Sequence, residues 1–444
     1  MPEIPPGDVL ARRDLRFDSS SPPLNDGFKW AVDRSLAWVR TDPSEVPSYW
    51  AGLTDRPLFY SRDVAHQLLG AHLLGLDEQN LAMMRTFAAS ATPARRYYPL
   101  WSFTFTGEPG AIDYTSDDHF VREIPAAYEL VEKALEQYLW TGDPRWIKDP
   151  ELARFRGTTV REYTAEHDIL GLGLAGEAGT GDIFQGLASY NEQHHGDHPL
   201  IAADGVATQW AALKAISTIL GPAAAAGVVD DDGLAAEAGT SADRIAQMFA
   251  RDWWSENDSR FASGRTADHY DTDMAWEASW YPAVKGLLPA GPSAEAHLRF
   301  LATQLRATPP TNIEAVTYLP EAFFAYHHDA EAMYWIEYLL ASRADYPEVP
   351  FNIVSHLAVG LPGLRPTGPD AIETDSHLLS DEDWATVENI AVGPYVIDIA
   401  IRGRQATTIT VRTGPRPLRW TARFGDFTES TIIAPGETSI LPAS

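Results

Sequence analysis

The stretch between Asp268 and Tyr281 holds the densest mixture of carboxylates and aromatic side chains in the chain. Glu277 follows Trp276 and lies three residues before Trp280, so a helix places its carboxyl group beside an aromatic surface. Burial next to aromatic rings raises the pKa of a carboxyl group, as a general acid requires. Glu277 is therefore a candidate catalytic residue, and Trp276, Trp280 and Tyr281 are candidate substrate-binding residues.

A second carboxylate, Glu314, follows the proline pair Pro309–Pro310. It falls in the first turn of a predicted helix, where a carboxylate either caps the helix or faces a pocket, and both interpretations stay open. Asn312 and Glu321 lie in the same stretch and are candidate substrate contacts. Hydrolysis of a glycosidic bond needs two carboxyl groups, one protonated and one charged. Carboxylates from different loops meet that need if the loops converge.

Four further loops carry polar and aromatic side chains ahead of predicted helices. Asp63 either pairs with Arg62 at a helix N-terminus or binds a sugar hydroxyl. Asp118 has the alternative of capping the helix that follows it. The candidate residues from these loops are Arg62, Asp63, His66, Trp101, Asp118, Asn191, His194, His195 and Glu348.

The histidines at 194, 195 and 198 invite a metal interpretation. Their spacing matches no zinc signature, and adjacent imidazoles rarely converge on one ion. We therefore interpret this loop as one for substrate binding or proton transfer. The sequence predicts neither a metal site nor a cofactor.

Apolar residues recur at three- and four-residue spacing from about residue 27 to residue 362, which predicts twelve helices. Short joints at 75–77, 141–143 and 327–329 predict tight turns, whereas long connections precede every second helix. If helices alternate between an outer and an inner ring, the long loops meet at one end, and an (α/α)6 toroid results. The predicted helices lie near 27–41, 62–75, 77–91, 119–141, 144–164, 201–220, 239–255, 276–288, 293–306, 313–327, 330–343 and 351–361.

The pattern changes after about residue 365. Segments 395–402, 406–412 and 418–423 alternate as strands between turns that contain glycine and proline, which predicts a small antiparallel β-sheet. The fold class is thus mainly α, an (α/α)6 toroid with a small C-terminal antiparallel β domain. We predict three parts, which are an N-terminal extension (1–26), a catalytic barrel domain (27–364) and a C-terminal β-sheet domain (365–444).

The amino-acid composition limits which kinds of binding partner and which compartment we expect for the protein. The chain has 444 residues, with 34 Lys and Arg against 62 Asp and Glu, and its formal net charge of -28 disfavours nucleic acid and anionic membranes. It has no cysteine, so it has no disulfide and no thiolate ligand. The first residues show no secretory signal, and no apolar run is long enough to span a bilayer, so we expect a cytoplasmic protein. The sequence does not specify an oligomeric state.

With the ring and its loops predicted, the chain resembles the six-hairpin glycosidase superfamily, which includes bacterial α-L-rhamnosidases, trehalases and glucoamylases. The resemblance rests on the segments 60–63, 139–143, 276–277 and 312–321 and covers most of residues 27–362. Members of the superfamily usually invert configuration with a carboxylic acid and a carboxylate base. The resemblance implies Glu277 as the general acid and Glu314 as the general base. It also implies that Asp63 and Arg62 bind the sugar, and Asp63 is a further catalytic candidate. Asp273, Glu321 and Glu348 remain substitutes.

The function predicted from the sequence is a glycoside hydrolase for a small oligosaccharide or glycoside, exo-acting and inverting. One alternative is an (α/α)6 sugar epimerase or isomerase that uses the histidines at 194, 195 and 198. Another is a sugar-binding protein without catalysis. The sequence leaves the sugar, the linkage and the anomer open.

Overall fold

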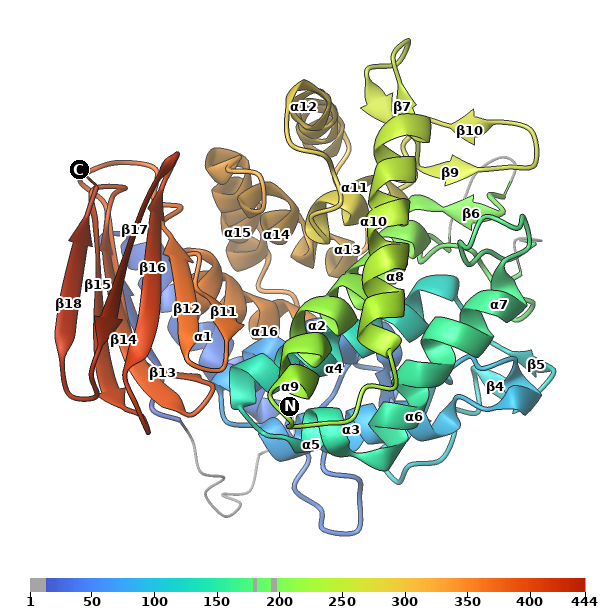
Figure 1. Ribbon diagram of the computed structural model, residues 1–444, viewed down its shortest axis with the longest axis horizontal. Coiled ribbons are helices and arrows are strands. Elements are labelled where there is room, and N and C mark those ends of the chain that lie inside the picture. The colour runs from blue at the N-terminus through green and yellow to red at the C-terminus, as the bar shows by residue number, and fades with distance from the viewer. Residues whose placement is uncertain (1–12, 179–181, 193–197, 444) are drawn as a thin grey trace.

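The computed structural model describes residues 13–178, 182–192 and 198–443. Within these ranges, helices in two concentric rings form an (α/α)6 toroid, and the C-terminal strands stack against one side of it (Figure 1). The predicted fold class is confirmed. Among the described residues, no helix is long and apolar enough to cross a membrane.

The inner ring consists of helices that are buried on nearly every side, as α2 illustrates with twelve of its thirteen residues buried. Consecutive inner helices pack on one another, and α16 returns to pack on α2, which closes the ring. Gly70 allows this closure, because a Cβ there would lie 2.1 Å from the carbonyl oxygen of Phe351. The inner helices are α2 (Ser61–Leu73), α4 (Ile124–Thr141), α8 (Ala203–Ala215), α11 (Glu277–Val284), α13 (Ile313–Thr317) with α14 (Leu319–Phe324), and α16 (Glu348–Ser355).

The outer helices bury one face each. In α10, Ala238, Ala242, Ile245 and Phe249 recur at three- and four-residue spacing and face the inner ring, which is the amphipathic pattern that the sequence predicted. The outer segments are α1 (Pro22–Ala37), α3 (Asp77–Ser90), α5 (Arg145–Lys148) with α6 (Pro150–Thr158) and α7 (Thr164–His167), α10 (Leu234–Asp252), α12 (Pro292–Ala307) and α15 (Asp329–Ser342). Short helical extensions are η1 (Pro93–Arg95), η2 (Thr159–Tyr163), η3 (Ile216–Leu220), α9 (Gly221–Ala225) and η4 (His356–Gly360).

The loops that lead into inner helices meet at one end of the ring. Strand β2 before α2 pairs with β3 before α4, and β6 before α8 pairs with β9 before α11. The connections before α13 (308–312) and α16 (343–347) are short, although the sequence predicted a long connection before every second helix. The loop strands are β2 (Leu58–Tyr60), β3 (Ser102–Thr104), β4 (Tyr114–Ser116), β5 (His119–Phe120), β6 (Ile201–Ala202), β7 (Trp254–Ser255), β8 (Arg260–Phe261), β9 (Gly264–Arg265) and β10 (Tyr270–Asp271).

Three helix starts differ from the sequence prediction by five residues, and one of them is α10, which begins at Leu234 and not at 239. Helix α1 begins at Pro22, earlier than the predicted residue 27. Helix α4 begins at Ile124 and not at 119, because His119–Phe120 pairs with β4 as a strand. Asp118 therefore lies in the exposed turn of a β-hairpin and does not cap α4. Periodicity could not reveal this hairpin, since two-residue strands carry no period of their own.

The C-terminal region forms two sheets, in the orders β1-β13-β14-β15-β18 and β11-β12-β16-β17. The predicted strands at 395–402, 406–412 and 418–423 are present as β14, β15 and β16. One pair, β12 with β16, is parallel, contrary to the antiparallel prediction, because the chain passes through three strands of the other sheet between them. The strands are β11 (Arg365–Gly368), β12 (Ala371–Asp375), β13 (Trp384–Val392), β14 (Tyr395–Arg402), β15 (Ala406–Thr413), β16 (Leu418–Phe424), β17 (Phe427–Ile433) and β18 (Thr438–Pro442).

The remaining strand of the first sheet comes from the other end of the chain. Strand β1 (Arg16–Ser19) pairs antiparallel with β13, within the segment that the sequence assigned to an N-terminal extension. The ring and the β region also touch directly, since the Gly393 N–H donates to the carbonyl oxygen of Trp140 at 2.7 Å. Such non-local pairs are invisible to local sequence patterns.

Candidate active site

The candidate site lies where the inner helices begin. Arg62 and Asp63 are in the first turn of α2, Glu277 is the first residue of α11, Glu314 is in the first turn of α13, and Glu348 is the first residue of α16. All five side chains are buried. Because every inner helix starts at the same end, residues far apart in the sequence converge there, and the helix dipoles favour carboxylates at these positions.

Arg62 supplies positive charge to this acidic site. Its Nε lies 2.5 Å from Oε1 of Glu314, while Glu192 and Glu123 lie 3.6 Å and 3.9 Å from its terminal nitrogens. The guanidinium also donates to the carbonyl oxygen of Tyr190 at 3.1 Å and lies 5.0 Å from that ring. Burial lowers the pKa of Arg62, but the surrounding carboxylates raise it well above its ordinary value. Arg62 therefore stays charged.

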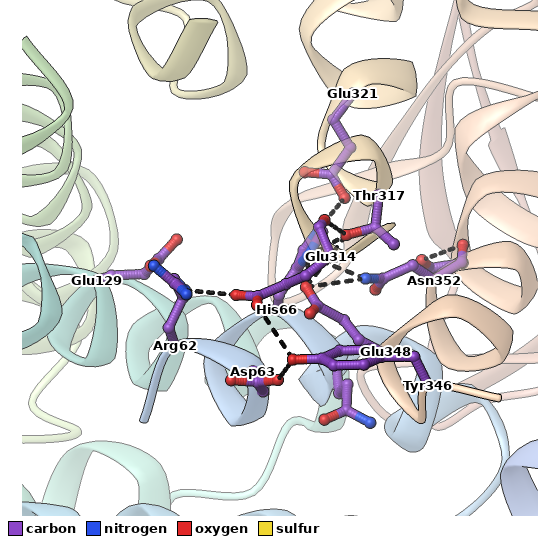
Figure 2. A network of polar contacts seen from close by, with 12 residues as sticks. Arg62, Asp63, His66, Glu129, Glu314, Thr317, Glu321, Tyr346, Glu348 and Asn352 are labelled. Carbon is purple, nitrogen blue, oxygen red and sulfur yellow. Dashed lines mark hydrogen bonds and ion pairs between the residues drawn. The ribbon is translucent and has the colours of Figure 1, made fainter. Parts of the chain in front are cut away.

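Asp63, Glu314 and Glu348 form a cluster of three carboxylates (Figure 2) whose facing oxygens lie within 4.8 Å of one another. The hydroxyl oxygen of Tyr346 lies 2.6 Å from Asp63 and 3.1 Å from Glu314 and bridges the two. Burial, followed by repulsion from Glu314 and Glu348, raises the pKa of Asp63 well above its usual range. Carboxylate oxygens this close are also the donor type that a hard cation uses, but Arg62 already contacts the Glu314 carboxylate.

His66 connects the cluster to a fourth carboxylate. Its Nδ1 is hydrogen-bonded to Glu348, and its Nε2 lies 3.1 Å from Oε1 of Glu321 (Figure 2). The imidazole ring also stacks on Tyr318, with the ring centroids 3.7 Å apart. Burial lowers the pKa of His66, but Glu321 and Glu348 raise it to about 9. Burial raises the pKa of Glu348 to about 7 despite the opposing effect of His66. His66 is thus an imidazolium at neutral pH.

Glu277 is in a different electrostatic environment from Glu314. Burial raises the pKa of Glu277 to about 8, and the opposing attraction of Arg62 does not cancel this effect. The preceding residue, Trp276, has a φ of 41°, a left-handed conformation that is rare for a bulky side chain. Strained backbone of this kind is concentrated at functional sites. Glu277 is therefore protonated at neutral pH, beside a strained and half-buried tryptophan.

The predicted aromatic contacts separate into two groups. Trp101 and Trp276 are half-buried, and the indole nitrogen of Trp101 donates to Glu123 at 2.8 Å. Trp280 and Tyr281 are fully buried and pack among the core residues. Their predicted contact with a substrate stays a prediction. Sequence spacing could not separate the groups, because both arrangements satisfy the same helical period.

The remaining candidates lie at varied distances from the cluster. Asn312 caps α13, accepting from the Glu314 N–H at 3.1 Å, and its amide lies 3.2 Å from the Glu314 carboxylate. Asn191 is buried and its N–H donates to Ser189 at 2.9 Å. Asp118 is exposed in the β4–β5 turn. His194 and His195 lie outside the described residues.

Several residues of the site were not among the sequence candidates. Glu123 precedes α4, Tyr346 precedes α16, and Asn352 lies 2.9 Å from His66 Nδ1. The hydroxyl of Tyr190 donates to the Glu129 carboxylate at 2.7 Å, and the ammonium group of Lys285 donates to the same carboxylate at 2.8 Å. One signal could have identified Glu123 and Tyr346, since both lie within two residues of the start of an inner helix, as Asn312 and Trp276 do.

Solved structures similar to this chain share its fold at low sequence identity. A GH78 family rhamnosidase of Bacillus sp. GL1 has a TM-score of 0.62 at 13% identity, over 93% of this chain and 43% of that one. A putative kojibiose phosphorylase from the human microbiome has a TM-score of 0.61 at 8% identity, over 97% and 63%. An alpha mannosidase from Streptococcus pneumoniae, described as metal-independent, has a TM-score of 0.53 at 13% identity, over 76% and 94%.

These matches show the six-hairpin (α/α)6 fold, as the resemblance in the sequence implied. The chain spans 43% of the length of the rhamnosidase and 63% of that of the phosphorylase. No family model and no curated protein sequence matches the chain.

Proposed function

We propose that this chain, which has the six-hairpin fold, is a glycoside hydrolase in which Glu277 is the general acid and Glu314 the general base. The observation that carries the proposal is the contrast between these two buried carboxyl groups. The pKa of Glu277 is raised to about 8, whereas Glu314 is ion-paired with Arg62 at 2.5 Å. Paired carboxyl groups in opposite environments are the arrangement that acid–base hydrolysis requires.

In the proposed reaction, the protonated Glu277 donates its proton to the oxygen of the scissile glycosidic bond as that bond breaks. Glu314 takes a proton from a water molecule, whose oxygen attacks the anomeric carbon from the opposite face. Arg62 holds Glu314 in place and supplies the opposing positive charge. On the basis of the superfamily resemblance, we propose that the reaction inverts the configuration at the anomeric carbon.

The other polar groups of the site suit the binding of a neutral sugar. Asp63 and Glu321 offer carboxylate oxygens, and the half-buried Trp101 and Trp276 offer aromatic surface. Because the catalytic carboxyl groups are buried, the end of a sugar chain can reach them more easily than the middle of a polymer can. We therefore propose exo-action on a small oligosaccharide or glycoside.

The epimerase alternative needs a neutral histidine as a base. Among the described histidines, His66 is the one that contacts the carboxylate cluster, and its pKa is raised to about 9, so it is a poor base at neutral pH. This observation argues against His66 as that base. His194 and His195, which the epimerase alternative would use, lie outside the described residues. An epimerase would give a product of the same mass as its substrate, whereas hydrolysis adds one water.

The test is to incubate the protein with aryl-glycosides and natural disaccharides and to follow the products by ¹H NMR, which reports both cleavage and the first anomer formed. Glu277→Gln and Glu314→Gln are each expected to lower turnover by about 100- to 10,000-fold while sugar binding is retained. Glu237→Gln, in an exposed pair with Arg161, is the matched control. Full activity in both site variants contradicts the assignment, and binding to a glycan panel without hydrolysis supports a sugar-binding protein instead.

A further inference from the structure

A second cluster of ionisable side chains lies at the opposite end of the ring from Glu314. His327 lies in the turn between α14 and α15, and Asp329 is the first residue of α15. His377 follows strand β12 of the C-terminal region. Because this turn joins an inner helix to an outer one, it lies away from the loops that form the candidate active site. The cluster therefore serves some other purpose than the proposed hydrolysis.

The three side chains converge closely. One donor atom from each of His327, Asp329 and His377 lies within 4.8 Å of the other two. The Nδ1 of His377 lies 2.8 Å from Oδ1 of Asp329, and Nε2 of His327 lies 3.5 Å from Oδ2 of Asp375. In a tetrahedral zinc site with bonds of about 2.0 Å, ligand atoms are about 3.3 Å apart. Small side-chain rotations would bring these donors to that separation.

Two imidazoles and a carboxylate are a donor set that Zn²⁺ and similar ions use. Asp375 lies beside them in contact with His327. His377 and Asp329 are buried, whereas the side chain of His327 is half exposed.

Two further contacts bear on the site. Arg404 is hydrogen-bonded to Oδ2 of Asp329, whereas His377 contacts Oδ1, so one carboxylate oxygen can serve a metal while the other keeps the arginine. His327 has a φ of 58°, and its side chain is 49% exposed, which leaves an approach from solvent. A left-handed histidine is uncommon, although histidine tolerates this conformation better than most residues.

We propose that His327, Asp329 and His377 bind one divalent transition-metal ion of the Zn²⁺ type, which links the α14–α15 turn to the C-terminal β region. The ion adds a cross-link between segments that are joined in this area by the His377–Asp329 and Arg404–Asp329 contacts. Its role is structural, so binding raises the melting temperature and leaves glycoside turnover unchanged.

The experiment uses the whole protein, stripped with a chelator and titrated with ZnCl₂ by calorimetry. We expect saturable binding of one ion and a rise in melting temperature. His327→Gly removes a ligand while suiting the left-handed backbone, and we expect its affinity to fall at least tenfold. His328→Ala is the matched control, since His328 is the neighbouring residue and pairs with Glu295 at 3.2 Å. We expect it to bind as the unaltered protein does.

Two results overturn the proposal. One is the absence of saturable Zn²⁺ binding, and the other is equal affinity in His327→Gly, which places the bound ion elsewhere. Mg²⁺ is a further probe, because it prefers oxygen ligands and is expected not to compete. Equal competition by Mg²⁺ contradicts a site built on imidazoles. Because His327 is half exposed, the decisive variant does not depend on replacing the buried His377.

Discussion

Arg62 Nε lies 2.5 Å from Glu314 Oε1, and the two side chains are only 8% and 7% exposed. The pair joins the first turns of α2 and α13, which are separated by most of the length of the ring domain in sequence. A buried charge without its partner is costly, so each residue of this pair depends on the other. Among the described residues, Arg62 is the only arginine whose guanidinium contacts the carboxylate cluster.

Replacing Arg62 with methionine leaves Glu314 and Glu123 buried without their cation. We expect the free energy of unfolding to fall by about 3–5 kcal/mol, as for other broken buried pairs, with loss of turnover. Urea denaturation measures the first effect. Arg161→Met is the control, since Arg161 and Glu237 form a pair that is 45% and 47% exposed, and such a loss costs at most about 1 kcal/mol. Equal destabilisation by both variants contradicts a buried, mutually dependent pair.

The pKa of Glu277 predicts how activity depends on pH. A general acid works only while protonated, so kcat/KM should fall as the pH rises through about 8, the pKa to which burial raises Glu277. The measurement is a pH–rate profile with a cleavable glycoside. The absence of an alkaline limb argues against Glu277 as the general acid. So does an alkaline limb that stays unchanged with a substrate that has a better leaving group.

The same pKa predicts a slope in stability. Between its ordinary value of 4.5 and about 8, folded Glu277 holds a proton that the unfolded chain has released, so stability falls as pH rises. Glu277→Gln removes this loss. Its stability relative to the unaltered protein should therefore increase by up to about 1.4 kcal/mol for each pH unit in that window. Denaturation at several pH values measures the difference, and a constant difference refutes the raised pKa.

His66 is expected to remain protonated at pH 8, since Glu321 and Glu348 raise its pKa to about 9. His377 provides an internal contrast, because burial lowers its pKa to about 4 and keeps it neutral. Long-range ¹H–¹⁵N NMR of the imidazole nitrogens distinguishes the two states, with His66→Gln used to assign the signal. Titration of His66 near its ordinary value of 6.5 would remove the argument against a histidine base.

Gly70→Ala tests the closure of the inner ring. The added Cβ would lie 2.1 Å from the backbone carbonyl oxygen of Phe351, so α2 and α16 must separate, and we expect a loss of about 1–3 kcal/mol in stability. Gly157→Ala is the matched control, since it lies within α6 and a Cβ there meets nothing within 4 Å. That change should stabilise the protein by about 0.5–1 kcal/mol, because alanine favours helix. Thermal unfolding compares the two variants.

Much of the fold was predictable from the sequence because helical periodicity is local. Each outer helix repeats apolar residues every three or four positions, and strands β14 to β16 alternate, so element types and most boundaries followed from neighbouring residues. The hairpin at His119–Phe120 and the parallel pair β12–β16 were missed. Both depend on pairing between strands, which the periodicity of neighbouring residues does not reveal.

The sequence by itself determined that helices alternate in a closed ring and that their long loops carry the acidic and aromatic side chains. Tertiary structure decided which of those side chains meet. Trp276 and Trp280 have the same residue type and lie at the start of one helix, yet one is half-buried and the other is fully buried in the core. Likewise, only the closed ring brings Arg62 to Glu314 and His66 between Glu321 and Glu348. Their protonation follows from burial and from charges hundreds of residues away, which no local pattern encodes.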